Sequence, residues 1–283
     1  MTGSAAPARR PPLLLVYAVT VTGIMSNTLI LPAIPDILDD FGQPDGSAGV
    51  LVASGSLAGI LVAPVIGGLA DRFGRRRALV PCLVLFSAAG ALGGLAPGFW
   101  VLVGARFVQG IGSAGLINLS VVIIGDHWDG EARARAIGRN SAVLTVSLAV
   151  LPALGGLLTE LGTWRYAFGP YLLGLVTAVV AWRVLDDDVH TAGLPVREQV
   201  RGAVAVLRRP MIAGMITAGV LVFILIFGLF LATLPLLLED EFGLGAGARG
   251  LVASAPAATA TLVAFNVGRL QARISRRRPT LAW

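Results

Sequence analysis

The sequence predicts an all-α integral membrane protein. Hydrophobic residues make up 55% of the 283 residues and charged residues only 13%, whereas a soluble domain carries roughly 25% charged residues. The mean hydropathy is +0.81, and a soluble fold of this size could not bury so much apolar surface. Eight apolar segments are long enough to cross a lipid bilayer, which takes about 20 residues per helix. Because backbone groups have no water partners in lipid, each segment should be helical.

The eight expected spans follow one another along the chain. The first begins at Leu13, and its apolar stretch is too long for the core of a signal peptide, so we expect an uncleaved span. The second carries small residues four apart from Gly55 to Gly67, which places them on one helix face and permits close helix contact. The expected spans are residues 13–37, 47–70, 78–97, 99–125, 138–161, 165–185, 211–237 and 248–270.

The arginines predict the orientation of these spans. All 22 basic residues are arginine, and 19 of them fall in alternate connections, which the positive-inside rule assigns to the cytoplasm. The opposite connections carry acidic residues at 39–45 and 239–241. We therefore expect an even number of spans with a cytoplasmic N-terminus. Arginines clustered between apolar segments favour membrane orientation over nucleic-acid binding. The nineteen are Arg9, Arg10, Arg72, Arg75, Arg76, Arg77, Arg133, Arg135, Arg139, Arg183, Arg197, Arg201, Arg208, Arg209, Arg269, Arg273, Arg276, Arg277 and Arg278.

A long polar stretch divides the chain into two units. We expect a cytoplasmic N-terminus at 1–12, a six-helix transmembrane bundle at 13–185, a cytoplasmic linker at 186–210, and two spans with a basic segment at 211–283. Within the linker, Val196–Leu207 is amphipathic and predicts a short helix on the membrane surface. An internal repeat supports the division, because GGLADRFGRRR at Gly67–Arg77 is matched by GRLQARISRRR at Gly268–Arg278, and repeated halves are typical of transporters.

The segment Gly67–Arg77 also resembles the signature loop of the major facilitator superfamily, and it lies between the second and third spans as in that family. Gly74 permits a tight turn, and Asp71 can pair with a nearby arginine. The resemblance implies that this loop holds the two halves of the transporter together and gates their movement. The alternative is a basic loop that only sets orientation. The residues concerned are Gly67, Leu69, Asp71, Arg72, Gly74, Arg75, Arg76 and Arg77.

Further motifs resemble those of the drug:proton antiporter branch of this family. This resemblance implies a protein of the bacterial plasma membrane. A proline motif near the outer end of the first span is matched at Pro32–Pro35, and the fourth-span motif at Arg106–Gly112. The helix-packing motif of the fifth span is matched incompletely, because Ser147 and Leu151 stand where glycines are usual. Its matching residues are Gly138, Pro152, Gly155 and Gly156.

The resemblance also implies twelve spans in two six-helix bundles, whereas eight are expected here. The chain corresponds to a six-helix N-terminal bundle plus two helices of an incomplete second bundle, as expected for a chain truncated after the eighth span. In the second copy of the signature, Ala272 replaces the acid that Asp71 supplies in the first. Self-association of two chains could complete the second bundle.

Polar residues within and beside the spans are candidates for proton coupling or a substrate path. An arginine at membrane depth costs at least about 2.5–3.5 kcal/mol on insertion scales, so Arg106 should face a polar interior or an acid. The resemblance implies a role for it in proton coupling; the alternative is a structural arginine that bonds backbone and Gln109. Asp126 could pair with the signature arginines. The candidates are Arg106, Gln109, Asn27, Asp36, Asn118 and Asp126.

No catalytic or metal-binding constellation is present in the sequence. The two histidines, His127 and His190, lie far apart, and Cys82 is the single cysteine, so no metal-ligand spacing exists. We therefore expect neither an enzyme nor a metal or organic cofactor, and a proton gradient would supply the energy. The expected partners are the lipid bilayer, protons and a small-molecule substrate.

These observations predict a secondary transporter that exports small hydrophobic compounds or drugs by proton-coupled alternating access. Two alternatives remain open. One is a transport-inactive remnant of such a transporter, and the other is a membrane interaction protein that does not transport.

Overall fold

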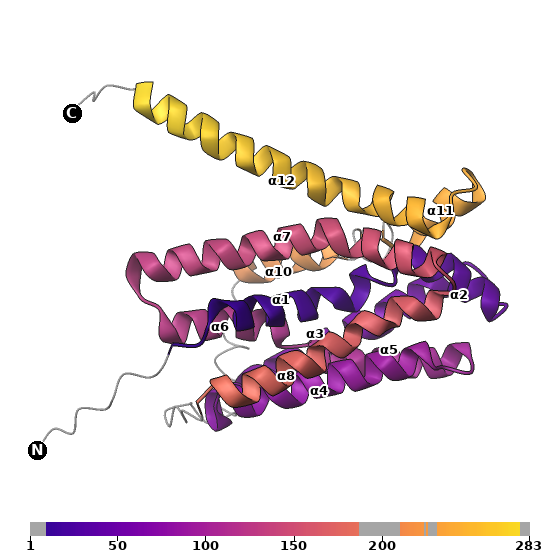
Figure 1. Ribbon diagram of the computed structural model, residues 1–283, viewed down its shortest axis with the longest axis horizontal. Coiled ribbons are helices and arrows are strands. Elements are labelled where there is room, and N and C mark those ends of the chain that lie inside the picture. The colour runs from indigo at the N-terminus through magenta and orange to yellow at the C-terminus, as the bar shows by residue number, and fades with distance from the viewer. Residues whose placement is uncertain (1–9, 187–209, 224, 226–230, 278–283) are drawn as a thin grey trace, which may run out of the picture.

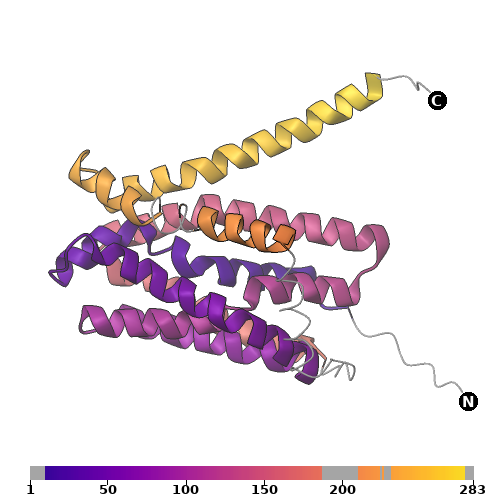
Figure 2. The same ribbon diagram turned by 180° about the vertical axis from the view of Figure 1, so that it is seen from behind.

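The computed structural model describes residues 10–186, 210–223, 225 and 231–277, and its regular elements are all helices within these ranges. Figures 1 and 2 show the helices packed side by side along one long axis. The elements are α1 (Leu13–Thr28), η1 (Leu31–Ala33), α2 (Ile34–Asp40), α3 (Ser47–Phe73), α4 (Arg75–Gly94), α5 (Phe99–Ser113), α6 (Leu116–His127), α7 (Gly130–Glu160), η2 (Trp164–Leu172), α8 (Leu173–Val184), α10 (Pro210–Phe223), α11 (Leu231–Asp240) and α12 (Ala246–Arg277).

Six helical segments in the described residues are long and apolar enough to cross a membrane, and they confirm the six-helix unit expected from the sequence. They are Leu13–Asp40, Ser47–Phe73, Arg75–Gly94, Phe99–His127, Gly130–Glu160 and Trp164–Val184. The seventh expected span coincides with α10 and α11, and the eighth with α12. The expected surface helix at Val196–Leu207 lies outside the described residues.

Two spans that were expected to be continuous are interrupted. The first span changes from α1 to the 3-10 turn η1 and then to α2, where Pro32 and Pro35 each occupy one of the first positions of a new helix. Proline has no backbone N–H and therefore disrupts the hydrogen bonds of a helix interior. It is well suited to the first turn, where the N–H groups have no partner within the helix. The fourth span is interrupted between α5 and α6 at Gly115, beside Ile66 of α3.

Several helices extend beyond the apolar segments that predicted them. α7 begins at Gly130, eight residues before the expected start, and α12 continues to Arg277. The α7 extension contains Arg133 and Arg135, whose long side chains can reach polar surroundings from a helix end. The apolar pattern locates the membrane core, whereas the helix continues as long as its backbone bonds are satisfied.

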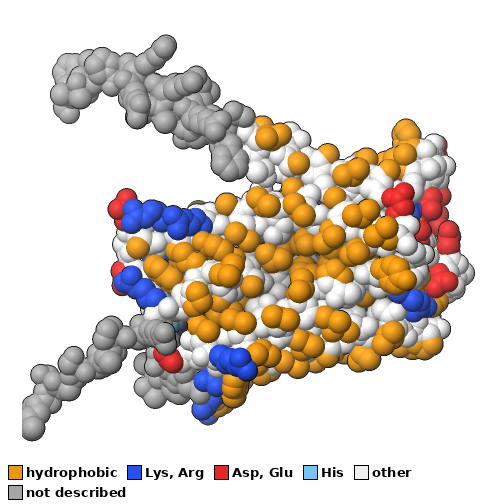
Figure 3. Space-filling model, viewed as in Figure 1, with side chains coloured by type: hydrophobic (Ala, Val, Ile, Leu, Met, Phe, Trp, Pro, Cys, Tyr) orange, Lys and Arg blue, Asp and Glu red, His pale blue; other side chains and the backbone are white. Residues whose placement is uncertain are grey.

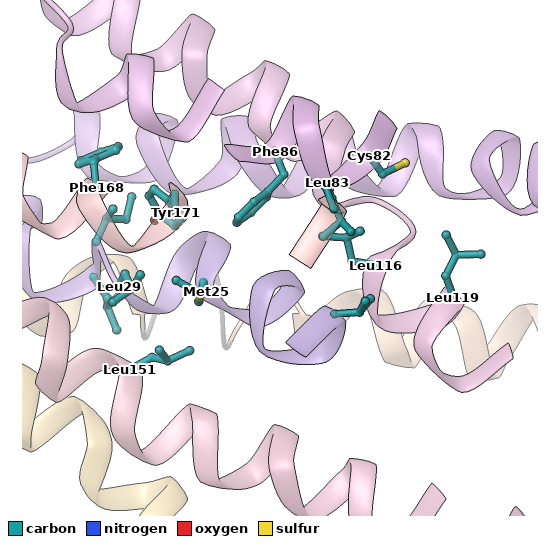
Figure 4. Packing of buried hydrophobic residues seen from close by; sticks show 14 of the residues in the cluster. Met25, Leu29, Cys82, Leu83, Phe86, Leu116, Leu119, Leu151, Phe168 and Tyr171 are labelled. Carbon is teal, nitrogen blue, oxygen red and sulfur yellow. The ribbon is translucent and has the colours of Figure 1, made fainter. Parts of the chain in front are cut away.

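A buried apolar core joins the helices of the first six spans. Met25 from α1 and Leu29, the residue after α1, pack toward Phe86 from α4 and Tyr171 from η2 (Figure 4). The rings of Phe86 and Tyr171 meet edge to face, with centroids 5.4 Å apart, an arrangement that aromatic pairs prefer. Outward-facing hydrophobic side chains such as Leu14 and Trp100 are largely exposed, and the side in Figure 3 is covered with apolar side chains. Lipid is the medium that suits such a surface.

The helix α12 contacts α7 at one end only. Both views show the two helices close together beside α11 and increasingly separate toward the end of α12 (Figures 1 and 2). The contact is tight, because a Cβ atom at Gly156 would overlap the Ala246 carbonyl oxygen and one at Gly250 would lie 2.5 Å from that of Pro152. The Ala153 N–H also donates to the Ser254 hydroxyl at 3.1 Å.

Candidate functional site

The signature segment contains a single non-helical residue, so the tight turn expected at Gly74 is present but the connection is shorter than the spans ending at 70 and beginning at 78 predicted. α3 ends at Phe73 and α4 begins at Arg75, with Gly74 between them at φ 93°. Such a φ is strained for a residue with a side chain and readily adopted by glycine. Gly74 therefore lets one span follow the other without a loop, and the basic residues from Arg75 onward lie in the first turn of α4.

An ion-pair network surrounds this turn, and we call this region the Arg75 end. Arg75 Nη1 lies 2.5 Å from an Asp71 oxygen, and its Nε donates to Asp126 at 2.8 Å. The network ties α3, α4 and α6 together within the first six spans. Arg76 stacks on the Trp182 ring of α8, with 3.9 Å between the guanidinium carbon and the ring centroid. Leu69 and Arg72 lie on the surface, and the space around Gly67 is open.

Arg106 lies in the interior of the six-span unit, with 1% of its surface exposed. One guanidinium nitrogen donates to the Ser26 carbonyl oxygen at 2.6 Å and to the Gln109 side-chain oxygen, and the other donates to the Asn27 side-chain oxygen. Asn27 in turn donates to the Ser56 hydroxyl at 2.9 Å. Three of the predicted candidates, Arg106, Gln109 and Asn27, therefore share one network that connects α1, α3 and α5.

A second buried polar network lies between α1, α6 and α7. The Thr20 hydroxyl lies 2.8 Å from both the Ser120 hydroxyl and the Asn140 side-chain oxygen, and Asn140 donates to Ser120 at 3.2 Å. All three side chains are buried. Hydrogen bonds of this kind hold transmembrane helices together, so this network is structural.

A cavity of about 720 Å³ lies between the first six spans and the later helices. Its lining comes from α1, α3, α5, α6 and α7 on one side and from α11 and α12 on the other. Asn27 and Asn118 line it, whereas Arg106 lies behind Asn27 and does not. The other polar lining residues are Ser26, Thr28, Ser56 and Ser113. Asp36 and Asp126 are absent from the lining of this cavity in the described residues.

A buried arginine joins the first span to the later helices at the opposite end from Arg75. Arg249 of α12 is 1% exposed and pairs with Asp36 of α2 and, at 2.7 Å, with Glu239 of α11. We call these three residues the Arg249 cluster. Burial raises the pKa of the Glu239 carboxyl, the charge of Arg249 opposes this shift, and Asp36 and Asp39 add to it.

Sequence reasoning missed the role of Arg249 in this cluster. It identified Asp36 as a candidate for proton coupling or a substrate path, but it named no partner for Asp36 and did not include Arg249 among the candidates. The two residues are 213 positions apart, so no local pattern relates them. The signal that could have been used is that Arg249 lies at the start of the expected eighth span and is not among the nineteen arginines of the cytoplasmic connections, so it breaks the charge pattern.

The candidate packing motif of the fifth span divides between two environments. Pro152 and Gly156 form the contact with α12, and Gly155 packs against Leu29, the residue after α1, where a Cβ atom would overlap the Leu29 carbonyl oxygen. Gly138 lies near the other end of α7, and a Cβ atom there would meet nothing within 4 Å. Three of the four residues therefore lie at close backbone contacts.

The family model of the Major Facilitator Superfamily matches residues 16–282. The chain belongs to the major facilitator superfamily. A bacterial homologue of the human lysosomal transporter Spinster, solved in an inward-facing and unoccupied conformation, shares the fold of this superfamily member with a TM-score of 0.74 and 22% identity, over 96% of this chain and 64% of that one.

The curated relatives of this superfamily protein include resistance proteins. The tetracycline resistance protein, class C, of Escherichia coli is 40% identical over 134 residues, which are 46% of this chain and 33% of that protein. Multidrug resistance protein 1 of Bacillus subtilis is 24% identical over 235 residues, which are 80% of this chain and 60% of that protein. The chain thus spans a third to three fifths of the length of these two relatives.

Proposed function

We propose that this major facilitator superfamily protein exports small, mainly apolar molecules by proton-coupled alternating access, through the cavity beside Asn27. The observation that carries the proposal is the position of this cavity between the six-span unit and α11 and α12. Relative movement of these two groups of helices would expose such a cavity to either side of the membrane in turn. The named relatives that confer tetracycline and multidrug resistance support export of this kind of compound.

The two ends of the molecule are proposed to play different parts. α12 is packed against α7 at the Arg249 cluster and diverges from it toward the Arg75 end. Basic side chains gather at the Arg75 end and acidic ones at the other end (Figure 3), so the positive-inside rule assigns the Arg75 end to the cytoplasm. In this arrangement the external end is closed, and the signature residues Asp71 and Arg75 would control opening and closing of the internal end.

Tetracycline efflux tests the proposal directly. Everted membrane vesicles containing the chain would be energised to form an inward proton gradient, and tetracycline fluorescence inside them would be followed with and without a protonophore. We expect accumulation that collapses with the gradient. Accumulation at the level of vesicles without the chain would contradict export and favour the alternative of a transport-inactive or non-transporting membrane protein.

A further inference from the structure

We infer that the cavity discriminates by charge: it prefers uncharged, mainly apolar molecules, and between ions of equal shape it accepts the anion better than the cation. This inference rests on the proposed function, because it takes the cavity to be the substrate site. It specifies the substrate class that the position of the cavity alone does not determine.

The first step is the state of Arg106. A guanidinium remains protonated in proteins, and this one is almost completely removed from solvent. Its nitrogens donate to a backbone carbonyl oxygen and to the amide oxygens of Asn27 and Gln109. These acceptors stabilise the charge by hydrogen bonding, yet each is neutral. Within the described part of the chain no carboxylate pairs with Arg106, so its positive charge is not cancelled locally.

The second step is the path from this charge to the cavity. Asn27 lines the cavity and accepts from Arg106, so one side chain separates the guanidinium from a bound molecule. Ser26, whose carbonyl oxygen is another acceptor, also lines the cavity. All cavity-lining residues in the described ranges are uncharged. No lining carboxylate in those ranges therefore screens the field of Arg106 from a ligand.

The third step is the consequence for ligands. Charges interact strongly where the effective dielectric constant is well below that of water. At a separation of several ångströms, the interaction between Arg106 and a singly charged ligand then changes the affinity for that ligand on the order of tenfold. For a cation, repulsion from Arg106 adds to the unfavourable free energy of leaving water for an apolar cavity. For an anion, attraction to Arg106 offsets part of that desolvation free energy, and for an uncharged molecule neither contribution arises.

Three naphthalene derivatives of matched shape test the inference. Their tert-butyl, trimethylammonium and sulfonate groups are similar in size and carry no charge, a positive charge and a negative charge. Binding to the purified full chain in lipid nanodiscs would be measured by equilibrium dialysis, with empty nanodiscs subtracted. We expect the cation to bind at least tenfold more weakly than the uncharged compound, with the anion between them.

The variant Asn27→Asp provides the decisive comparison, because it places a carboxylate against the Arg106 guanidinium. The ratio of the cation Kd to the uncharged-compound Kd should fall at least fivefold. Asn27→Leu is the matched control, since it removes the same amide without adding charge and should leave the ratio high. Gel filtration would establish that both variants remain monodisperse. A loss of affinity that is common to both compounds cancels in the ratio of the two Kd values.

The outcomes separate this inference from the proposed function. If the cation binds as tightly as the uncharged compound, or if both Asn27 variants change the ratio equally, the inference is wrong. If none of the three compounds binds at the cavity, both proposals fail. If the expected ranking is found but vesicles do not accumulate tetracycline, charge discrimination stands and the export proposal fails.

Discussion

Two arginines of this protein are equally buried but lie in opposite electrostatic surroundings. Arg249 meets two carboxylates, Asp36 and Glu239, that come from different parts of the chain. Arg106 meets neutral oxygen atoms, and all of them belong to the six-span unit. A charge that is paired with carboxylates joins helices at a particular place, whereas a charge held by neutral acceptors still acts on its surroundings. The difference separates a paired charge that joins α2, α11 and α12 from a charge held by neutral acceptors, for which a role in transport is proposed.

The largest effect is expected from Arg106→Gln, which removes the unpaired charge and most of the donors. Tetracycline accumulation in vesicles should fall at least tenfold, and the buried acceptors that lose a donor should cost roughly 1–3 kcal/mol of stability. The effect is measured as the rate of tetracycline accumulation in vesicles that contain equal amounts of membrane-inserted wild-type or variant protein. Wild-type transport by Arg106→Gln would show that Arg106 is structural and would remove the contrast between the two sites.

A smaller effect is expected from Arg249→Gln, which leaves two carboxylates without their partner. Removing one member of a buried ion pair costs roughly 3–5 kcal/mol, but Asp36 and Glu239 are each more than a third exposed, so about 2 kcal/mol is expected after solvent screening. Thermal unfolding in detergent measures the loss. A double-mutant cycle with Asp36→Asn isolates the pair, and additive effects of the two changes would show that the ion pair contributes nothing.

The glycine contact beside the Arg249 cluster predicts a comparable but purely steric effect. Gly156→Leu would force α7 and α12 apart, because even a Cβ atom overlaps the Ala246 carbonyl oxygen, and overpacking typically costs about 1–3 kcal/mol. Gly138→Ala is the matched control on the same helix. It should be neutral or stabilising by roughly 0.5–1 kcal/mol, since open space surrounds that position. Equal melting temperatures for the two variants would contradict the close contact.

The smallest effect is the pH dependence that Glu239 contributes. Because burial raises the pKa of this carboxyl, the folded protein holds its proton at pH values where the unfolded chain has released it. The resulting stability is present below the ordinary glutamate pKa and is lost as the pH rises through the raised value. Since the side chain is about a third exposed, the contribution should stay under roughly 0.5 kcal/mol. Glu239→Gln should remove this part of the pH dependence of thermal unfolding, and an unchanged pH profile would contradict it.

The six-span unit could be predicted from the sequence because a bilayer imposes a constraint along the chain itself. Apolar length and the absence of charge predict a span without knowledge of any neighbour. The same reasoning correctly expected a tight turn at Gly74, but it ended the second span too early and began the third too late, since a positive φ at one residue can replace a longer loop. It also placed the start of α7 too late, because helices continue past the apolar core into polar surroundings.

The sequence by itself therefore determined that this chain is a helical membrane protein of the major facilitator type and which residues bear charge at unusual depth. The tertiary structure alone decided which of those charges are paired. Asp36 and Arg249 meet across 213 positions of sequence, and Arg106 finds its neutral acceptors on α1 as well as at Gln109 of its own helix. Pairing depends on distances in space, and the folding of helices against one another sets these distances without any trace in local sequence pattern.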